Sequence, residues 1–470
     1  MKVRRILLYV FIISTYLSAF GQKRNQNPNN PNVIYILADD LGYGDLSCLG
    51  QTKFDTPHID QLAQKGMIFT QHYSGSTVCA PSRSVLMTGQ HTGHTPIRGN
   101  NAIALPNESL TLAEILKAKG YTTGAFGKWG LGKVGSEGDP LQQGFDRFYG
   151  FNNQSLAHNY YPYFLWDNDS KIELTANKGT KMGQYAPELI HKKAMEFIDI
   201  NKDNAFFLYY PSILPHAELV APERYMKKFR GKFGTETPYI GVDDGPRFRK
   251  GPYASQENPH AAFAAMITLL DEQVGEIVEK LEKLKIAENT LIIFTSDNGP
   301  HKEGGADPEF FNSNGPFKGV KRDLYEGGIH VPMIASWPKK IKAGSKTDHI
   351  SAFWDILPTC AEIIGTEKPK DIDGISLLPT LLGNENLQQK HEYLYWEFYE
   401  KKGRQAVRMG DWKGIRYDVK KGPNAALELY NLANDKGETT DVSKENSKIV
   451  AQIMKIIEEA HDPSEIYNFN

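Results

Sequence analysis

The sequence predicts an α/β fold: a large, mainly parallel sheet sandwiched by helices, then a smaller C-terminal α+β subdomain with an antiparallel sheet. Short apolar runs that contain β-branched residues, at 33–37 and 291–294, indicate buried strands. Amphipathic segments at 110–120 and 260–284 indicate helices between them. Strands that alternate with helices of this length favour a parallel sheet covered on both faces.

The pattern changes between residues 365 and 386, and the segments beyond are typical of an antiparallel sheet. Three strand-like segments are followed by a charged helix: 392–400, 405–417, 426–432 and then about 444–460. We therefore expect a main domain over residues 32–385 and a C-terminal subdomain over residues 386–470.

Composition describes an ordinary globular protein without a global charge bias. Of the 470 residues 40% are hydrophobic, and the formal net charge is −2, so nothing points to nucleic acid or an anionic membrane surface as a partner. Three cysteines do not make a disulfide framework, and a core of this size does not need one. We expect Cys48 and Cys360 to be free thiols.

The N-terminus is typical of a cleaved secretory signal over residues 1–21. Lys2, Arg4 and Arg5 precede an apolar stretch that ends in the small-x-small sequence Ala19-Phe20-Gly21. The unbroken apolar run is shorter than the roughly 20 residues that span a bilayer, although a membrane anchor is the alternative. We expect a flexible leader over 22–31, a periplasmic or secreted protein, and no membrane span after cleavage.

Acidic and amide side chains follow two of the predicted strands. Asp39 and Asp40 come directly after the first strand, and Asp297 and Asn298 come directly after the later one. Ligands collect beyond the carboxyl ends of parallel strands, so these side chains can converge. Oxygen ligands suit Ca²⁺ or Mg²⁺. The alternative is that they are only turn residues, which Asp and Asn often are.

A second group of residues is positively charged or can carry a proton. Cys79 and Arg83 flank the predicted start of a helix near Pro81, where free N–H groups face an anion. The other members are Lys128 in a glycine-framed turn, His216 in a loop, and Lys321. A cation and several positive groups suit the cleavage of an oxyanion ester. A free thiol is a poor partner for a hard cation, so an oxygen is expected at residue 79.

Cys79-Ala80-Pro81-Ser82-Arg83 resembles the C-x-P-S-R signature of the type I, formylglycine-dependent sulfatases, and the resemblance extends over about residues 31–470. Further matches are Asp39-Asp40, Gly127-Lys128-Trp129, Ser296-Asp297-Asn298-Gly299, and Lys321 five residues before Glu326. The combination with Ala-His-Asn-Tyr-Tyr-Pro is similar to secreted bacterial carbohydrate sulfatases. The resemblance implies an alkaline-phosphatase-like fold, with the catalytic domain over 32–385.

The resemblance also implies the cofactors and the roles of the site residues. A maturase would oxidise Cys79 to formylglycine (3-oxoalanine), whose hydrated form attacks sulfur and then expels sulfate. One Ca²⁺ would be held by Asp39, Asp40, Cys79, Asp297 and Asn298. Arg83 would steady the nucleophile, Lys128 and Lys321 would neutralise sulfate oxygens, and His216 would protonate the leaving oxygen. The implied substrate is a sulfated polysaccharide or oligosaccharide.

Other activities share this family of folds. An arylsulfatase, a phosphate or phosphonate monoester hydrolase, and an inactive protein that binds sulfated glycans are the alternatives. The aromatic segment 155–166 can form a sugar platform or belong to the core.

One position departs from the family pattern. Many relatives read Gly-Lys-Trp-His-Leu-Gly, and their histidine assists the breakdown of the sulfated intermediate, but this chain has Gly130 there. We expect His158 to enter the site as a substitute base, with Gly130 leaving space for it. The alternatives are that His158 contacts the sugar or lies on the surface.

Overall fold

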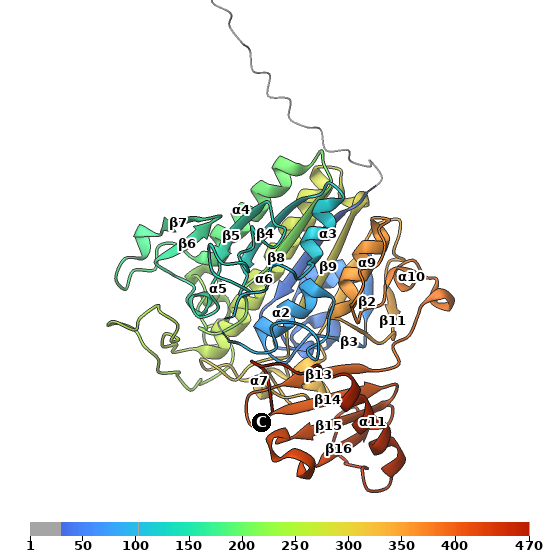
Figure 1. Ribbon diagram of the computed structural model, residues 1–470. Helices are drawn as coiled ribbons and strands as arrows, with labels where there is room; N and C mark the ends of the chain where they lie inside the picture. The colour runs from blue at the N-terminus through green and yellow to red at the C-terminus, as the bar shows by residue number, and fades with distance from the viewer. Residues whose placement is uncertain (1–29, 102, 470) are drawn as a thin grey trace, which may run out of the picture.

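The computed structural model describes residues 30–101 and 103–469, so the predicted signal and most of the leader lie outside the described residues. A ten-stranded sheet runs in the order β11-β2-β10-β9-β1-β8-β4-β5-β6-β7 (Figure 1). Its five central strands are parallel. The strands are β1 (Asn32–Ala38), β2 (Met67–Phe69), β4 (Thr122–Lys128), β5 (Arg147–Phe151), β6 (Phe164–Asp167), β7 (Ser170–Glu173), β8 (Phe206–Pro211), β9 (Thr290–Ser296), β10 (Met333–Ser336) and β11 (Ser345–Thr347).

Helices cover both faces of this sheet, because the central strands bury side chains on each side. On β1, Ile34 and Ile36 point into one cluster and Val33 and Tyr35 into the other. The first cluster takes side chains from α1 (Pro57–Lys65), α4 (Ala186–Asn201), α5 (Glu223–Phe229) and α6 (Pro259–Lys283). The second takes them from α2 (Cys79–Thr88), α3 (Leu112–Ala118) and α9 (Ile356–Ile363).

Strand register places the acidic turns at one edge of the sheet. Ala38 at the end of β1 pairs with Ser296 at the end of β9, so the turns that begin at Asp39 and Asp297 are neighbours. Lys128 ends β4 at the same edge, since β4 and β1 both run parallel to β8. The parallel arrangement thus brings together side chains that are more than 250 residues apart.

A four-stranded antiparallel sheet lies at one end of the main sheet (Figure 1). It contains β13 (Leu394–Phe398), β14 (Arg404–Met409), β15 (Trp412–Tyr417) and β16 (Leu427–Asn431). The helix α11 (Ser447–Glu459) packs on it through Ile453 and Ile457, with Tyr395 and Val407 beneath. The predicted fold class is confirmed, down to the antiparallel sheet and its closing helix.

Two further sequence expectations can be compared with the structure. None of the three cysteines is in a disulfide, as expected for Cys48 and Cys360. Within residues 30–101 and 103–469, no helix is both long and apolar enough to cross a bilayer.

Candidate active site

Three carboxylates and one amide meet where β1 and β9 end. The backbone N–H of Asp40 donates to Asp297 Oδ1 over 3.1 Å, and the backbone N–H of Leu41 donates to Ser296 Oγ over 2.9 Å. Asn298 Nδ2 donates to Asp40 Oδ1 over 2.7 Å. Asp39, Asp40, Asp297 and Asn298 are fully buried. The structure therefore brings together all four side chains that the sequence predicted to converge.

Each carboxylate is paired with one positive side chain. Lys128 Nζ lies 2.7 Å from Asp39 Oδ2, and Lys321 Nζ lies 2.7 Å from Asp40 Oδ2. Arg83 Nη2 lies 2.7 Å from Asp297 Oδ2. Three negative and three positive groups leave the cluster neutral, so a divalent cation would give it two positive charges. A positively charged cluster attracts an anionic ester, so the cluster is suited to an oxyanion once a metal is bound.

Cys79 is the first residue of α2 and points at these carboxylates. Its Sγ lies 3.4 Å from Asp39 Oδ1 and 3.9 Å from Asp40 Oδ1, and the side chain is buried. Burial and the charge of Asp297 raise the pKa of the Cys79 thiol well above its usual range. An unmodified Cys79 would therefore stay a neutral thiol, which is a poor nucleophile.

The donor set fits a hard divalent cation. Asn298 Oδ1 is buried and has no hydrogen-bond partner among the described residues, although buried amide oxygens are normally bonded. Burial and the neighbouring Asp39 charge raise the pKa of Asp297 to about 6, so a divalent cation bound here would favour the ionised carboxylate. Asp39, Asp40 and Cys79 offer ligand atoms within 4.8 Å of one another, together with His216. Oxygen-rich sets of this kind are typical of Ca²⁺.

His216 and Lys321 form a pair beside Asp40. His216 Nε2 lies 3.0 Å from Lys321 Nζ and 3.3 Å from Asp40 Oδ2. Burial and the Lys321 and Lys128 charges keep the pKa of His216 well below its usual range. The neutral imidazole can accept a hydrogen bond from the Lys321 ammonium, so the two side chains together hold a proton where a leaving oxygen would need it.

His158 lies next to this pair. Its ring stacks on that of His216 with centroids 4.8 Å apart and planes 9° apart, and its Nδ1 lies 3.1 Å from the carbonyl oxygen of Gly251. The carbonyl can only accept, so Nδ1 carries the hydrogen and Nε2 is left as a base. Burial and the Lys128 and Lys321 charges lower the pKa of His158 to about 4.

The space beside Gly130 is filled by Gln154, whereas we expected His158 there. A side chain at position 130 would lie 2.8 Å from Gln154 Nε2, and the φ angle of 79° also favours glycine. His158 reaches the site along a different route, through the loop that follows β5.

The aromatic segment 155–166 is largely core. Tyr160, Tyr161 and Leu165 are buried in the hydrophobic cluster that also contains α4 and α6. The Tyr160 hydroxyl donates to the carbonyl oxygen of His216 over 2.7 Å, so it holds the loop that carries this imidazole. The core interpretation is therefore the correct one for these three side chains.

Two contacts at the site have no counterpart in the motifs. Glu303 Oε2 lies 3.6 Å from Lys321 Nζ and 3.8 Å from His216 Nε2. The ring of His301 stacks on His216 with centroids 5.4 Å apart. Both residues follow the Asp297-Asn298 turn within a few positions. This closeness in the sequence is the feature from which their place in the site could have been predicted. Arg83, in turn, donates to Asp297 and to the carbonyl oxygen of Lys128.

Glu326, which belongs to the same motif as Lys321, lies in a different network. Its carboxylate is 2.8 Å from Lys413 Nζ and accepts a hydrogen bond from the Tyr73 hydroxyl over 2.6 Å. Since Lys413 lies on β15, Glu326 connects the main sheet to the C-terminal sheet and does not take part in the site.

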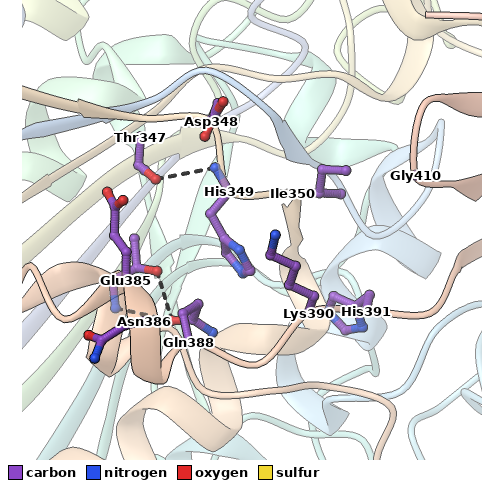
Figure 2. Close-up of a pocket in the computed structure, with 11 residues that line it drawn as sticks. Thr347, Asp348, His349, Ile350, Glu385, Asn386, Gln388, Lys390, His391 and Gly410 are labelled. Atoms are coloured by element: carbon purple, nitrogen blue, oxygen red, sulfur yellow. Dashed lines mark hydrogen bonds between the residues drawn. The ribbon is translucent and has the colours of Figure 1, made fainter. Parts of the chain in front are cut away.

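Cavities lie both beside the site and far from it. One of about 200 Å³ is lined by Asn100, Gly130, Asn152 and Gln154. Another, of about 540 Å³, is lined by residues from β11 and from the segment before β13, with Glu385, Asn386 and Gln388 facing Lys390 and His391 (Figure 2). It contains none of the catalytic candidates.

Comparison with known proteins agrees with this geometry. Residues 31–366 match the Sulfatase family, and residues 317–463 match the family "N-sulphoglucosamine sulphohydrolase, C-terminal". N-acetylgalactosamine-6-O-sulfatase of Bacteroides thetaiotaomicron is 30% identical, over 93% of this chain and 94% of that protein. Arylsulfatase A of Homo sapiens is 33% identical, over 82% of this chain and 74% of that protein.

Among solved structures, Ps i-CgsB in complex with k-i-k-neocarrahexaose is 29% identical, with a TM-score of 0.75 over 92% of each chain. A phosphonate monoester hydrolase of Agrobacterium radiobacter is 20% identical, with a TM-score of 0.65 over 93% of this chain and 97% of that one, which shows a shared fold. Because the Sulfatase family alone spans more than half of the 470 residues, this chain belongs to the sulfatase family and is a sulfuric ester hydrolase.

Proposed function

We propose that the protein removes sulfate from sulfated carbohydrates, in the breakdown of polysaccharides or oligosaccharides, by means of a formylglycine at residue 79 and one Ca²⁺. The observation that supports this best is the position of Cys79. Its Sγ faces the carboxylates of Asp39 and Asp40, next to an unpartnered Asn298 oxygen. An oxygen-bearing residue 79 would complete a cation site there, whereas the buried thiol cannot act as a nucleophile.

The cation would be held by Asp39, Asp40, Asp297, Asn298 and residue 79. When bound, Ca²⁺ supplies positive charge for the nucleophilic oxygen and the sulfate ester. Lys128 and Lys321 would then be shared between their carboxylate partners, Asp39 and Asp40, and the sulfate oxygens. Arg83 holds Asp297 and the end of β4 in position, since it binds both.

Proton transfer is assigned to the histidines. Lys321 and His216, 3.0 Å apart, supply the proton to the departing sugar oxygen. His158 is assigned the role of base when sulfate leaves residue 79, because its Nε2 is the acceptor and its ring is stacked on His216.

We propose a sugar sulfate as the substrate because relatives that align with most of this chain are named as sulfatases of such compounds. They include N-acetylgalactosamine-6-O-sulfatase, which matches this chain over 93% of its length. We further propose that residues 1–21 direct export to the periplasm or beyond, that 32–385 form the catalytic domain, and that a maturase is a transient partner.

The first test is mass spectrometry of protein made in a maturase-competent host. Residue 79 should carry an aldehyde, and Cys79→Ala should lose all measurable turnover at an unchanged melting temperature. Substrates are N-acetylgalactosamine 6-sulfate, sulfated neocarrageenan oligosaccharides and 4-nitrophenyl sulfate, with 4-nitrophenyl phosphate as the control. An active Cys79→Ala variant, or preference for the phosphate, would overturn the proposal.

A further inference from the structure

A polar cavity of about 200 Å³ next to the reaction centre has no role in the hydrolysis described above. Its walls are mainly neutral: the amides of Asn100, Asn152 and Gln154 and the hydroxyl of Ser136, with Lys133 as the one cation among its lining residues and no carboxylate. This composition differs from that of the reaction centre, where three cations and three carboxylates meet. The cavity is therefore suited to an uncharged polar group.

One hydrogen bond and one strand pairing place the cavity close to the reaction centre. Asn100 Oδ1 accepts a hydrogen bond from the backbone N–H of Ala80, the residue after Cys79, over 3.1 Å. Asn152 directly follows Phe151, which is paired with Lys128 in the sheet. A molecule bound by sulfate at Cys79 and Lys128 would thus have this cavity beside it.

Asn152 is the strongest indication that the cavity binds a polar ligand. Its side chain is only 4% exposed, yet neither Oδ1 nor Nδ2 has a hydrogen-bond partner among the described residues, and Gln154 Nε2 also has none. Leaving a buried amide unpaired is costly, so such groups are normally bonded to protein, water or ligand. A carboxamide presents a donor and an acceptor side by side, which matches a sugar hydroxyl or acetamido group.

Gly130 is part of the same arrangement. Any side chain at position 130 would lie 2.8 Å from Gln154 Nε2, so a histidine there could not coexist with the carboxamide in its present position. The glycine therefore leaves the Gln154 amide in the wall of the cavity, beside the end of β4.

We propose that this cavity is the subsite for the uncharged hydroxyl- or acetamido-bearing part of the sugar whose sulfate lies at residue 79, with Asn152 and Gln154 as its specificity-determining residues. The inference rests on the proposed sulfatase activity toward sugars. It adds that recognition of the ring is made by neutral amides and is separate from recognition of the sulfate.

The test compares Asn152→Ala and Gln154→Ala with the wild type on two substrates: the best sugar among N-acetylgalactosamine 6-sulfate and the neocarrageenan sulfates, and 4-nitrophenyl sulfate. For the sugar, KM should rise about tenfold in each variant, which is the size expected from lost hydrogen bonds. For 4-nitrophenyl sulfate, kcat/KM should stay within twofold. The melting temperature should not fall, because no hydrogen bond within the protein is lost at Asn152.

Binding gives a second readout that does not depend on turnover. Calorimetry of the same sugar on Cys79→Ala should show about tenfold weaker binding when Asn152→Ala is added. Asn386→Ala, in the distant cavity of Figure 2, is the matched control and should change neither quantity.

Equal losses on both substrates, or no loss on the sugar, would overturn the subsite while leaving the sulfatase proposal intact. A wild type with an aldehyde-free residue 79 and no turnover of any sulfate ester would contradict the proposed function itself. If Asn152→Ala is unstable, Gln154→Ala alone decides, since that side chain is only partly buried.

Discussion

Two buried charge networks in this molecule look alike and have different consequences. The reaction centre pairs Asp39, Asp40 and Asp297 with Lys128, Lys321 and Arg83. The junction network, between the main and C-terminal sheets, consists of Glu326, Lys413, Glu438, His330, Tyr73 and Arg408. In it Lys413 Nζ lies 2.8 Å from Glu326 and 3.0 Å from Glu438. Buried ion pairs therefore do not by themselves identify a catalytic site.

The two networks differ in which polar atoms lack a partner and in whether they contain a reactive group. The reaction centre contains a thiol, an unpartnered amide oxygen on Asn298, and three carboxylates close enough to share a cation. In the junction network, both Glu326 oxygens are bonded, to Lys413, Tyr73 and His330. Glu438 Oε1 has no hydrogen-bond partner among the described residues, but it lies 3.0 Å from the Lys413 ammonium, so its charge is already paired. Pairing without an open ligand position stabilises the structure, and pairing around an open position prepares it for a ligand.

Asp297→Asn should produce the largest effect on catalysis. It removes one negative charge and one cation ligand, so kcat/KM should fall by about a thousandfold or more, since metal stabilisation of the transition state is worth several kcal/mol. Bound calcium, measured by emission spectroscopy, should fall with it. Asp45→Asn is the matched control: Asp45 is equally buried, but among the residues that the structure describes its carboxylate accepts hydrogen bonds from Gly42 and Ser313 and contacts none of the three cations of the site.

The Asp45→Asn control should keep kcat/KM within about threefold of the wild-type value. Unchanged rate and calcium content in Asp297→Asn would show that the ligand assignment is wrong.

The sequence was sufficient to predict that the acidic turns meet, because strand order brings distant residues together in a regular way. Asp39 and Asp297 each follow a β-branched run, and parallel strands end at one edge, so the convergence could be inferred. The same reasoning cannot reach the junction network. Glu326 and Lys413 meet only because the antiparallel sheet docks at the end of the main one, and no local pattern encodes that docking.

Contacts made by loops were also beyond prediction. His158 was a candidate for the site, but that its ring stacks on His216 depends on how the loop after β5 folds over the loop after β8. Glu303 and the Asn152–Gln154 amides were missed for the same reason, because each contact depends on packing between segments without regular periodicity.

Unlike Asp297→Asn, Lys413→Met should lower stability while leaving catalysis normal. It leaves Glu326 and Glu438 buried without their cation, and breaking a buried pair in this way costs about 3 kcal/mol or more. Urea unfolding should show the loss, while kcat/KM per folded molecule should stay within twofold. The exposed Lys455, 3.3 Å from Glu459, provides Lys455→Met as a control that should cost less than about 0.5 kcal/mol.

A smaller effect is expected from His158→Ala. If His158 is the base that assists sulfate release, kcat should fall about a hundredfold, KM should stay within threefold, and mass spectrometry should find sulfate accumulated on residue 79. His94→Ala, in a separate cluster with His91 and Asp373, should leave all three unchanged. A rise in KM for sugars without accumulated sulfate would instead mean that His158 contacts the sugar.

The smallest prediction concerns acid stability near the junction network, where His72 lies fully buried on β3 (His72–Tyr73). Burial, with a smaller contribution from His330, lowers the pKa of His72 from its ordinary value of 6.5 to about 3. Below pH 6.5 the unfolded chain therefore binds a proton that the folded protein refuses. The contribution of the neutral His72 to the free energy of unfolding is fully present above pH 6.5 and is lost as the pH falls toward 3.

Between pH 7.5 and pH 5, this histidine alone should lower the free energy of unfolding by about 2 kcal/mol, at about 1.4 kcal/mol for each pH unit below 6.5. Urea unfolding of His72→Gln at both pH values should show a pH dependence that is smaller by that amount. The exposed His58 offers His58→Gln as the control, whose curve should run parallel to that of the wild type. Equal pH dependence in His72→Gln and the wild type would mean that His72 becomes charged without cost. The surroundings of His72, near the junction network, would then accommodate a charged imidazole.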